Sequence, residues 1–424
     1  MALQGDVLSK QDLDWVKCSD AKSIIILNEE ESSSRNQYNT SLLKILMNMK
    51  PVKSQTVIAE IYDEETQTLI QNTIGNRYRQ AESHLILLNE SEIMGDLLAQ
   101  VMISPVLNLV YMELLSFNKS EFYISNEKIE FHEYLKKYSH SIPLFSRRYD
   151  HQEELRLVVS DNASDFQKTN STSRISSVKN YPLVKKSLTK IYKDLEVLIV
   201  GSNTKNSYIM SSIVKFKKEK EAQINIQNKS HLDDETMAEI RENKFNVIVL
   251  LASDAKNNVI PSDFDSITNL LKIYDFCHNN HTEIIVELDD NRNYETILEY
   301  GVEYIILCNR YFSKMITQIS KDYRLYPFIL DLLTFDAGND KSYEIYIYKA
   351  RDLIEINDPI VFSSKMELIQ NMHSEVESRH IVVIGKVIEE GTSSKKSIQI
   401  FSGDLYTIEE LIIHPDTELI VISN

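Results

Sequence analysis

The amino-acid sequence predicts an α/β protein in which one unit with a parallel sheet occurs twice in tandem, and each copy is followed by a small α+β appendage. Two observations support this prediction. Short runs of β-branched and other apolar residues alternate with segments that suit helices of roughly 10 to 15 residues, a pattern typical of buried parallel strands joined by crossover helices. The same order of runs occurs again in the second half of the chain, which indicates a duplication.

The repeated order starts with an apolar strand, a helix that ends in the same four residues, and a second strand that carries an acidic residue. A short helix then ends at Gly75 or Gly301, and a third apolar strand follows. Pro105 or Pro327 separates two further helices, after which a last strand comes. So many elements in one order predict a duplicated Rossmann-like unit. The matching segments are 23–27 and 246–250, 42–45 and 270–273, 56–62 and 282–288, 85–88 and 304–307, 114–117 and 332–335, and 122–124 and 345–347.

The two copies differ at their start. In the second copy, residues 196–201 predict a first strand that enters a turn, and a helix near 208–218 and a strand at 223–226 follow. In the first copy, only a helix over residues 11–16 precedes the strand at 23–27. Since the first and fourth strands are central in the usual order of such a sheet, we expect the strand at 23–27 to have an unpaired edge. Another surface of the chain could cover this edge, but we favour a partner chain and a longer polypeptide.

Smaller segments follow each copy and complete the domain plan. A helical pattern over 130–138 and a strand at 154–160 follow the first copy, and another helical pattern with three strands follows the second. Residues 160–180 are rich in Ser, Asn, Thr and Asp, which is typical of a linker. The first predicted domain is a Rossmann-like unit truncated at its start (1–126), and an abbreviated appendage (127–162) and a linker (163–190) follow it. A second Rossmann-like unit (191–350) and a C-terminal appendage (351–424) complete the chain.

Composition restricts the partners of the chain. The 46 Lys and Arg residues against 63 Asp and Glu residues give a net charge of −17, which disfavours nucleic acid because phosphate backbones would be repelled. The three cysteines are widely separated and fit a reducing compartment. Residues 97–112 are uncharged but shorter than the roughly 20 apolar residues of a spanning helix, so they predict a buried helix pair broken at Pro105. We therefore predict a cytoplasmic protein without direct membrane insertion.

A degenerate phosphate-binding turn follows the first strand of the second copy. A dinucleotide turn needs three glycines, but among residues 201–206 only Gly201 is present, and Ser202 and Asn203 follow it. The acid that should hold a ribose at the end of the next strand is missing, because Gln227 and Asn228 follow Ile226 there. We interpret Gly201, Ser202 and Asn203 as a structural remnant of the fold in preference to a nicotinamide dinucleotide site.

Acidic residues stand at the same place in both copies. Glu60 lies inside an apolar strand and precedes Asp63, and Glu287 likewise precedes Asp289 and Asp290. Carboxylates at the carboxyl ends of parallel strands lie in the crevice where such sheets bind ligands, and clustered oxygens suit a hard cation such as calcium. The alternative is that these acids cap the following helices and stay solvated. No cofactor is assigned, and calcium is the candidate ion.

Four segments, at 12–27, 56–63, 112–117 and 121–124, carry a resemblance to a known family. In these segments the chain resembles the cytosolic part of CASTOR and POLLUX type ion channels. The resemblance implies tandem regulator-of-potassium-conductance domains, with appendages similar to the C-terminal domain of Trk-type potassium uptake regulators. It also implies a pore-forming segment before residue 1, which this sequence lacks, and a tetrameric gating ring of eight units that converts ion or ligand binding into pore opening. Residues 94–117 and 311–335 would then form contacts between neighbouring units.

Three hypotheses about function follow. The first is a non-catalytic regulatory module of a potassium or cation channel or transport system, acting as a homo-oligomer or with a pore-forming membrane subunit at the inner face of a membrane. The second is a Rossmann-fold enzyme that binds a small molecule or nucleotide, which would require an intact glycine turn and a paired acid and base. The third is a decayed remnant without a regulated pore. The first is favoured, so we predict that the chain is not an enzyme.

Overall fold

The computed structural model of the chain consists of two compact units. Unit 1 contains Met1–Met94 and Phe312–Tyr326, and unit 2 contains Gly95–Tyr311 and Pro327–Asn424. The structure describes residues 4–27, 35–117, 119–148, 154–165, 169, 194–220, 222–242, 244–253, 263–335, 342–376, 379–389 and 396–424.

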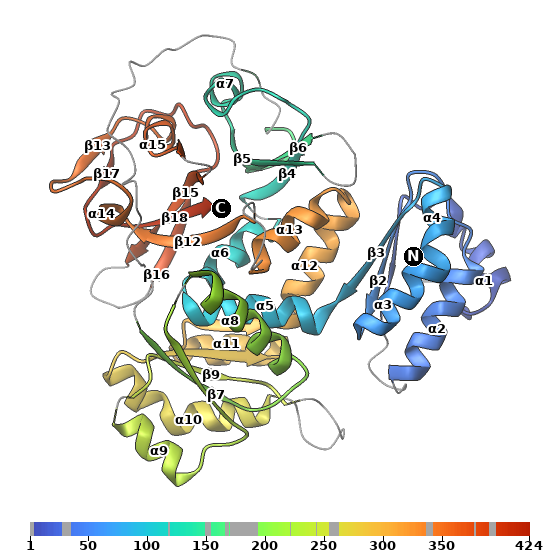
Figure 1. The fold of residues 1–424 in the computed structure, drawn as a ribbon, viewed down its shortest axis with the longest axis horizontal. Coiled ribbons are helices and arrows are strands. Elements are labelled where there is room, and N and C mark those ends of the chain that lie inside the picture. Colours follow the sequence, from blue (N-terminus) through green and yellow to red (C-terminus); the bar gives the residue numbers. More distant parts are fainter. Residues whose placement is uncertain are drawn as a thin grey trace. The chain divides into compact units, whose positions relative to one another are not determined.

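Unit 1 is built on a three-stranded parallel sheet in the order β1-β2-β3 (Figure 1). Its strands are β1 (Ser23–Ile26), β2 (Thr56–Ile61) and β3 (His84–Asn89). Leu42, Ile61, Ile70 and Tyr78 belong to one buried cluster, so the helices after β1 and β2 pack against one face of the sheet. The helical elements are α1 (Lys10–Trp15), η1 (Cys18–Asp20), α2 (Arg35–Asn48), α3 (Glu64–Ile70), η2 (Gln71–Gly75) and α4 (Asn76–Gln80).

The outer edge of β1 is unpaired within the described residues. β1 forms its ladder with β2 alone, and Ile25 in this strand is 42% exposed. In the second copy, the matching strand β9 (Val247–Leu250) pairs on both sides, and all four of its residues are buried. The sequence-based prediction of an unpaired strand edge in the first copy is therefore confirmed, and what covers this edge stays a prediction.

Unit 2 contains a five-stranded parallel sheet in the order β11-β10-β9-β7-β8. Counted from β7, this is the doubly wound order 2-1-3-4-5, with its switch point between β7 and β9. Leu198, Leu250 and Val286 are fully buried in its core. The remaining elements are β7 (Leu195–Val200), α8 (Asn206–Lys220), β8 (Ile224–Lys229), α9 (Asp234–Arg241), α10 (Phe264–Asn279), β10 (Glu283–Leu288), α11 (Asn291–Glu299) and β11 (Tyr304–Leu307).

The two copies exchange helical segments. Residues 312–326, which include most of α12 (Cys308–Lys321), come from the second copy but belong to unit 1. There Ser23 Oγ donates a 2.6 Å hydrogen bond to Ser320 O, and the rings of His84 and Tyr323 stack with centroids 3.5 Å apart. The sequence repeat does not indicate this exchange, because each helix follows its own strand along the chain.

The exchange is reciprocal. From Gly95 onward, α5 (Glu90–Ile103) and α6 (Leu107–Leu114) of the first copy belong to unit 2. Asn108 Nδ2 donates to Ile305 O of β11 over 3.3 Å, and the Tyr311 hydroxyl donates to Asn108 O over 2.8 Å. Both helices are largely buried. α5 ends before Pro105 and α6 begins after it, as the sequence predicted. Among the helices that the structure describes, none combines the length and apolar character needed to cross a membrane.

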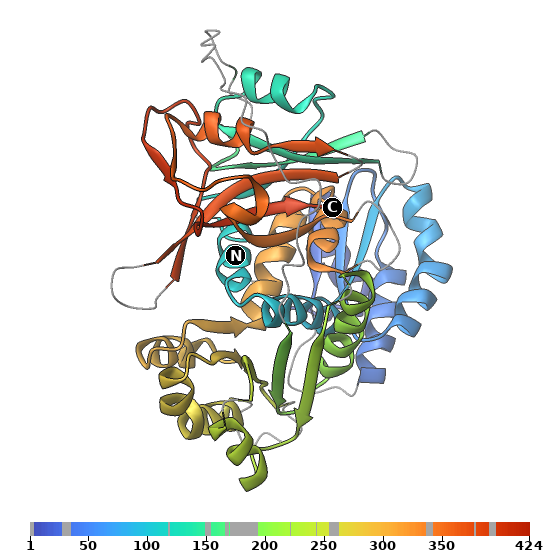
Figure 2. The ribbon, with the colours of Figure 1, turned by 60° about the vertical axis from the view of Figure 1, so that its left-hand side comes forward.

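Both appendages are antiparallel and lie in unit 2. Figure 2 shows their strands near one another, and β5 contacts β15. The elements of the first are β4 (Glu121–Ser125), α7 (Phe131–Lys137), β5 (Ser141–Arg148) and β6 (Glu154–Ser160). Those leading to and forming the second are α13 (Leu325–Leu333), β12 (Glu344–Lys349), α14 (Ala350–Leu353), β13 (Ile360–Phe362), α15 (Lys365–Asn371), β14 (Ser374–Val376), β15 (Arg379–Glu389), β16 (Lys396–Ile400), β17 (Leu411–Ile413) and β18 (Glu418–Ser423).

In each copy, the pairing of one strand does not follow the predicted domain boundary. β4 and β12, which the sequence analysis placed at the ends of the Rossmann-like units 1–126 and 191–350, pair antiparallel with the appendage strands β6 and β18. The physical reason is that an apolar run indicates a buried strand but not the direction of its partner. The predicted linker 163–190 lies largely outside the described residues.

Gly95 provides a test of the exchanged helix. A Cβ atom there would lie 2.6 Å from Tyr208 Cβ and 3.2 Å from Lys205 O, so α5 packs directly on the start of α8. We expect Gly95→Ala to destabilise the protein by about 1–3 kcal/mol because the two backbones must separate. Chemical denaturation measures this. Gly75→Ala is the matched control, because its nearest neighbours would be 3.9 Å away, and it should be neutral or stabilising by up to about 1 kcal/mol. Equal effects would contradict the close packing of α5.

Candidate functional site

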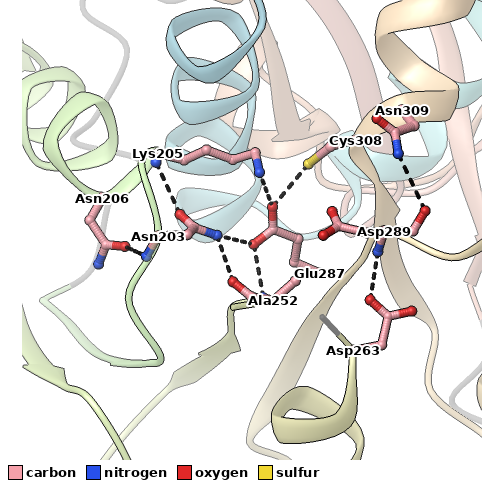
Figure 3. A network of polar contacts seen from close by, with 9 residues as sticks. All are labelled: Asn203, Lys205, Asn206, Ala252, Asp263, Glu287, Asp289, Cys308 and Asn309. Atoms are coloured by element: carbon pink, nitrogen blue, oxygen red, sulfur yellow. Dashed lines mark hydrogen bonds and ion pairs between the residues drawn. The ribbon is translucent and has the colours of Figure 1, made fainter. Parts of the chain in front are cut away.

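The crevice at the carboxyl ends of β7, β9, β10 and β11 holds a network of buried polar side chains (Figure 3). Open parallel sheets bind ligands in this place, beside the point where the strand order reverses. The network contains residues from five separate segments, and Asn203, Glu287 and Asp289 were among the residues predicted from the sequence.

Glu287 is at the centre of the network. Its exposed fraction is 0%, and both carboxylate oxygens are bonded. Oε1 lies 2.9 Å from Lys205 Nζ and accepts from Cys308 Sγ over 3.1 Å. Oε2 accepts from Asn203 Nδ2 over 2.8 Å and from Ala252 N over 3.0 Å. A buried carboxylate needs such partners, since an ion without them is costly to take out of water.

Lys205 is the positive partner, and its side chain is 12% exposed. Burial by itself would lower the pKa of Lys205, but the Glu287 carboxylate beside it raises the pKa of this ammonium group well above its ordinary value. The lysine therefore stays charged at neutral pH and compensates the charge of Glu287. Its ammonium group takes the position beside Glu287 that a bound cation would need.

The degenerate turn is closed by its own side chains. Gly201 has φ +107°, and a Cβ there would lie 2.7 Å from Leu251 O, so the turn requires the one glycine that the sequence retains. Asn203 N donates to Asn206 Oδ1 over 2.8 Å, and Lys205 N donates to Asn203 Oδ1 over 3.0 Å. In a dinucleotide site, backbone N–H groups of this turn and the helix start face the pyrophosphate. Here two of them are bonded to asparagine side chains.

The other acids of the second copy organise the start of α11. Asp263 accepts from Asp289 N over 2.7 Å and from Asp290 N over 3.0 Å. Asp290 caps α11 by accepting from Arg292 N, and its hydrogen bonds with the Arg292 side chain lower the pKa of this carboxyl group. The capping interpretation therefore describes Asp290. Asp263 was not singled out from the sequence, although it is almost fully buried.

In the first copy, Asp63 is also a helix cap. It accepts from Thr66 N over 2.6 Å and from Asn39 Nδ2 over 3.2 Å. Glu60 is buried, and its backbone carbonyl accepts from the Tyr38 hydroxyl over 2.9 Å. Glu60 and Glu287 are thus not the solvated groups that the alternative assumed. In the described part of the chain, no three His, Cys, Asp or Glu side chains are grouped as metal ligands, so calcium binding stays a prediction.

The sequence also contained a signal for the missed partners. A glutamate inside an apolar strand requires a cation or several donors nearby. The segments that end at the same edge of the sheet carry Lys205 and Cys308, five positions and one position after the last apolar residue of their strands. Their joint approach to Glu287 depends on strand order, which the sequence alone does not specify.

Comparisons with known proteins agree with this architecture. No family model matches the chain. The human SLO3 gating ring superposes with a TM-score of 0.66 at 11% identity and covers 99% of this chain and 90% of that one. The GsuK RCK domain superposes with a TM-score of 0.37 at 11% identity and covers 99% of this chain and 82% of that one. The GsuK channel bound to NAD superposes with a TM-score of 0.38 at 9% identity and covers 99% of this chain and 68% of that one. No inference is based on these two structures.

The fold is therefore similar to that of the human SLO3 gating ring, and the predicted α/β class with parallel sheets is confirmed. In sequence, 123 residues are 27% identical to the "Probable ion channel POLLUX" of Arabidopsis thaliana. This agrees with the resemblance on which the sequence analysis relied. The match covers 28% of this chain and 14% of the POLLUX protein.

Proposed function

We propose that the chain is a non-catalytic, cytosolic regulatory module of a potassium or cation channel or transport system, which couples ligand or ion binding to pore opening. The exchange of helices between the two copies carries this proposal. A displacement of α8 beside the crevice acts directly on α5, a helix of the other copy, because Gly95 packs on Lys205 and Tyr208. Transmission between copies is what a gating module requires. The fold of the SLO3 gating ring and the similarity to POLLUX support the same conclusion.

The crevice network supports regulation over catalysis. An enzyme of this fold would need free donors for a cofactor phosphate and an acid and a base that reach a substrate. Lys205 and Glu287 instead bond to each other, and the side chain of Asn203 bonds to Glu287. In this proposal the side chains of the crevice hold the ends of the strands together in a fixed position. Gly201, Ser202 and Asn203 form the turn of the crevice without a cofactor.

The proposed partners are further copies of this chain and a pore-forming membrane subunit, through which the module lies at the inner face of a membrane. Size-exclusion chromatography with light scattering tests the first part. The expected mass is about four times 49.2 kDa, because a ring of eight units needs four chains with two units each. A monomer at every concentration tested would contradict the ring.

A second measurement tests the regulatory role. In cells of the source organism, removal of the chain should change the potassium conductance or uptake of the membrane. Wild-type protein should restore it, and Gly95→Ala protein, whose α5 packs incorrectly on α8, should restore it less. Unchanged potassium transport after removal would contradict the proposed function, whatever the oligomeric state.

A further inference from the structure

Two adjoining cavities lie at the amino ends of β10 and β11 in unit 2, at the opposite end of these strands from the crevice network. Their volumes are about 250 Å³ and about 120 Å³. Glu283, Tyr304 and Lys396 line both of them. The walls of the larger cavity come from the Rossmann-like sheet, from the turn between α5 and α6, and from appendage strands β12, β16 and β18. Gly95, Lys205, Tyr208 and Glu287 line neither cavity, although α5 and α8 each contribute residues to the wall of the larger one.

Two polar groups in the shared wall have unused hydrogen-bonding capacity. Tyr304 is 2% exposed, yet its hydroxyl makes no hydrogen bond in the part of the chain that the structure describes. The half-buried carboxyl group of Glu283 likewise makes no hydrogen bond or ion pair with a described residue, although its backbone N donates to Asn246 O. Polar groups that line a cavity in this way are normally bonded to water or to a ligand. A ligand in the cavities would supply the missing partner of both.

The charges of the lining residues indicate the sign of the charge that such a ligand carries. Glu283, Glu344 and Glu418 line the larger cavity; Lys396 pairs with Glu418 over 3.1 Å, and Lys220 Nζ lies 3.7 Å from Glu344. Burial raises the pKa of the Glu283 carboxyl group, as do Glu303 and Glu418, while Lys396 opposes them. Among the described acids of the lining, Glu283 is thus the one without a lysine partner, and its carboxylate leaves one uncompensated negative charge when it is ionised. A cation would relieve it, and an anion would be repelled.

The apolar part of the lining favours an organic cation over a metal ion. Phe216, Phe335 and Tyr346 add aromatic surface to the larger cavity. Lys220 Nζ already lies 5.5 Å from the centroid of the Tyr346 ring, at cation–π distance, so the rings of Phe216 and Phe335 are the aromatic surface left for a ligand. Metal ions prefer several converging ligands, and the described residues contain no such group of three. The volume is below the roughly 300–1,000 Å³ of sites for drug-sized molecules, so the ligand is small.

We propose that the two cavities bind a small organic ammonium ion, which donates hydrogen bonds to the Glu283 carboxylate and the Tyr304 hydroxyl oxygen while its carbon chain lies against the aromatic wall. Such a ligand connects the sheet of the second Rossmann-like unit with the strands of the C-terminal appendage. It would thereby stabilise unit 2 without entering the crevice.

Isothermal titration calorimetry and thermal unfolding of the full chain with 1,5-diaminopentane test this, at constant ionic strength and neutral pH. We expect saturable binding and a raised melting temperature, whereas the uncharged 1,5-pentanediol should have neither effect. Glu283→Gln should weaken binding at least tenfold, since a charge-assisted hydrogen bond is lost, and Tyr304→Phe should weaken it severalfold. Glu299→Gln is the matched control, because this carboxylate is exposed on α11, and it should bind as the wild type does.

Three results would overturn the proposal. The first is equal binding of the diamine to the wild type and to Glu283→Gln. The second is equal binding of the diol. The third is displacement of the diamine by calcium or potassium chloride at low concentration with the same dependence on Glu283, which would make this an inorganic cation site. Circular dichroism of each unliganded variant shows whether it is folded, and Tyr304→Phe removes only a hydroxyl group, so it gives an independent result if Glu283→Gln does not fold.

Discussion

Replacing Lys205 by methionine is expected to destabilise unit 2 by about 3–5 kcal/mol. The side chains have similar length, but the variant leaves the fully buried carboxylate of Glu287 without the ammonium group that now lies 2.9 Å away. Removing one partner of a buried ion pair has this large effect because the remaining charge is still out of water. Urea denaturation followed by circular dichroism measures the change in the free energy of unfolding.

Matched variants separate the ion pair from general effects of the substitution. Lys244→Met removes a lysine whose pair with Glu242 also has a 2.9 Å separation but whose side chains are 51% and 64% exposed, and we expect a change within about 0.5 kcal/mol. The double variant Lys205→Met with Glu287→Gln removes both charges and keeps an acceptor for Ala252 N, so it should recover most of the lost stability. If Lys205→Met has no larger effect than Lys244→Met, the network does not stabilise the crevice.

Lowering the pH from 7 to 5 is expected to reduce the free energy of unfolding of unit 2 through a buried histidine pair at the contact between the two appendages. His373 is 7% exposed, and its Nε2 lies 3.1 Å from Nε2 of His380. Burial, together with His380 and His132, lowers the pKa of His373 to about 3, and burial together with Arg156 lowers the pKa of His380 to about 4. Phe131 stacks on His373 with centroids 3.6 Å apart, and Tyr343 contacts His380 edge-on.

The direction of the effect follows from proton binding. The unfolded chain binds protons at these histidines below pH about 6.5, but the folded chain does not until pH falls to about 4 or 3. The stabilisation is therefore complete above pH 6.5 and is lost as the pH falls through this window. At pH 5 the loss is about 2 kcal/mol for each histidine, since one pKa unit corresponds to about 1.4 kcal/mol.

His373→Phe tests this assignment, because phenylalanine keeps the stacking on Phe131 and does not titrate. The variant should lose about 2 kcal/mol less stability than the wild type between pH 7 and pH 5, as measured by urea denaturation at each pH. His231→Gln, at an exposed histidine, should keep the wild-type dependence. An identical dependence in the wild type and His373→Phe would show that the pair titrates normally.

The duplication and most strands could be predicted from the sequence. Apolar runs such as 247–250 and 304–307 are strands in the structure, with every residue buried, because a parallel sheet covered on both faces excludes polar side chains. β5 was missed, since it contains Pro143, a register shift and two arginines, and its pattern is not that of a buried strand. The direction of β4 and β12 was also missed, because pairing with β6 and β18 involves residues distant in sequence.

The candidate site was predicted in part. Glu287 stood out because a carboxylate within an apolar strand contradicts the pattern around it, and Asn203 belonged to a recognisable turn. Lys205, Cys308 and Asp263 were not predicted as members of the site, since their segments meet only at the edge of the folded sheet.

The sequence by itself determined that this protein is a tandem repeat of a glycine-poor Rossmann-like unit, because helix and strand periodicity are local properties of the chain. Only the tertiary structure decided that the copies exchange their helices and that Lys205 neutralises Glu287 in the crevice. Both depend on contacts between residues about 80 to 300 positions apart, whose free energy is gained only when several segments pack together.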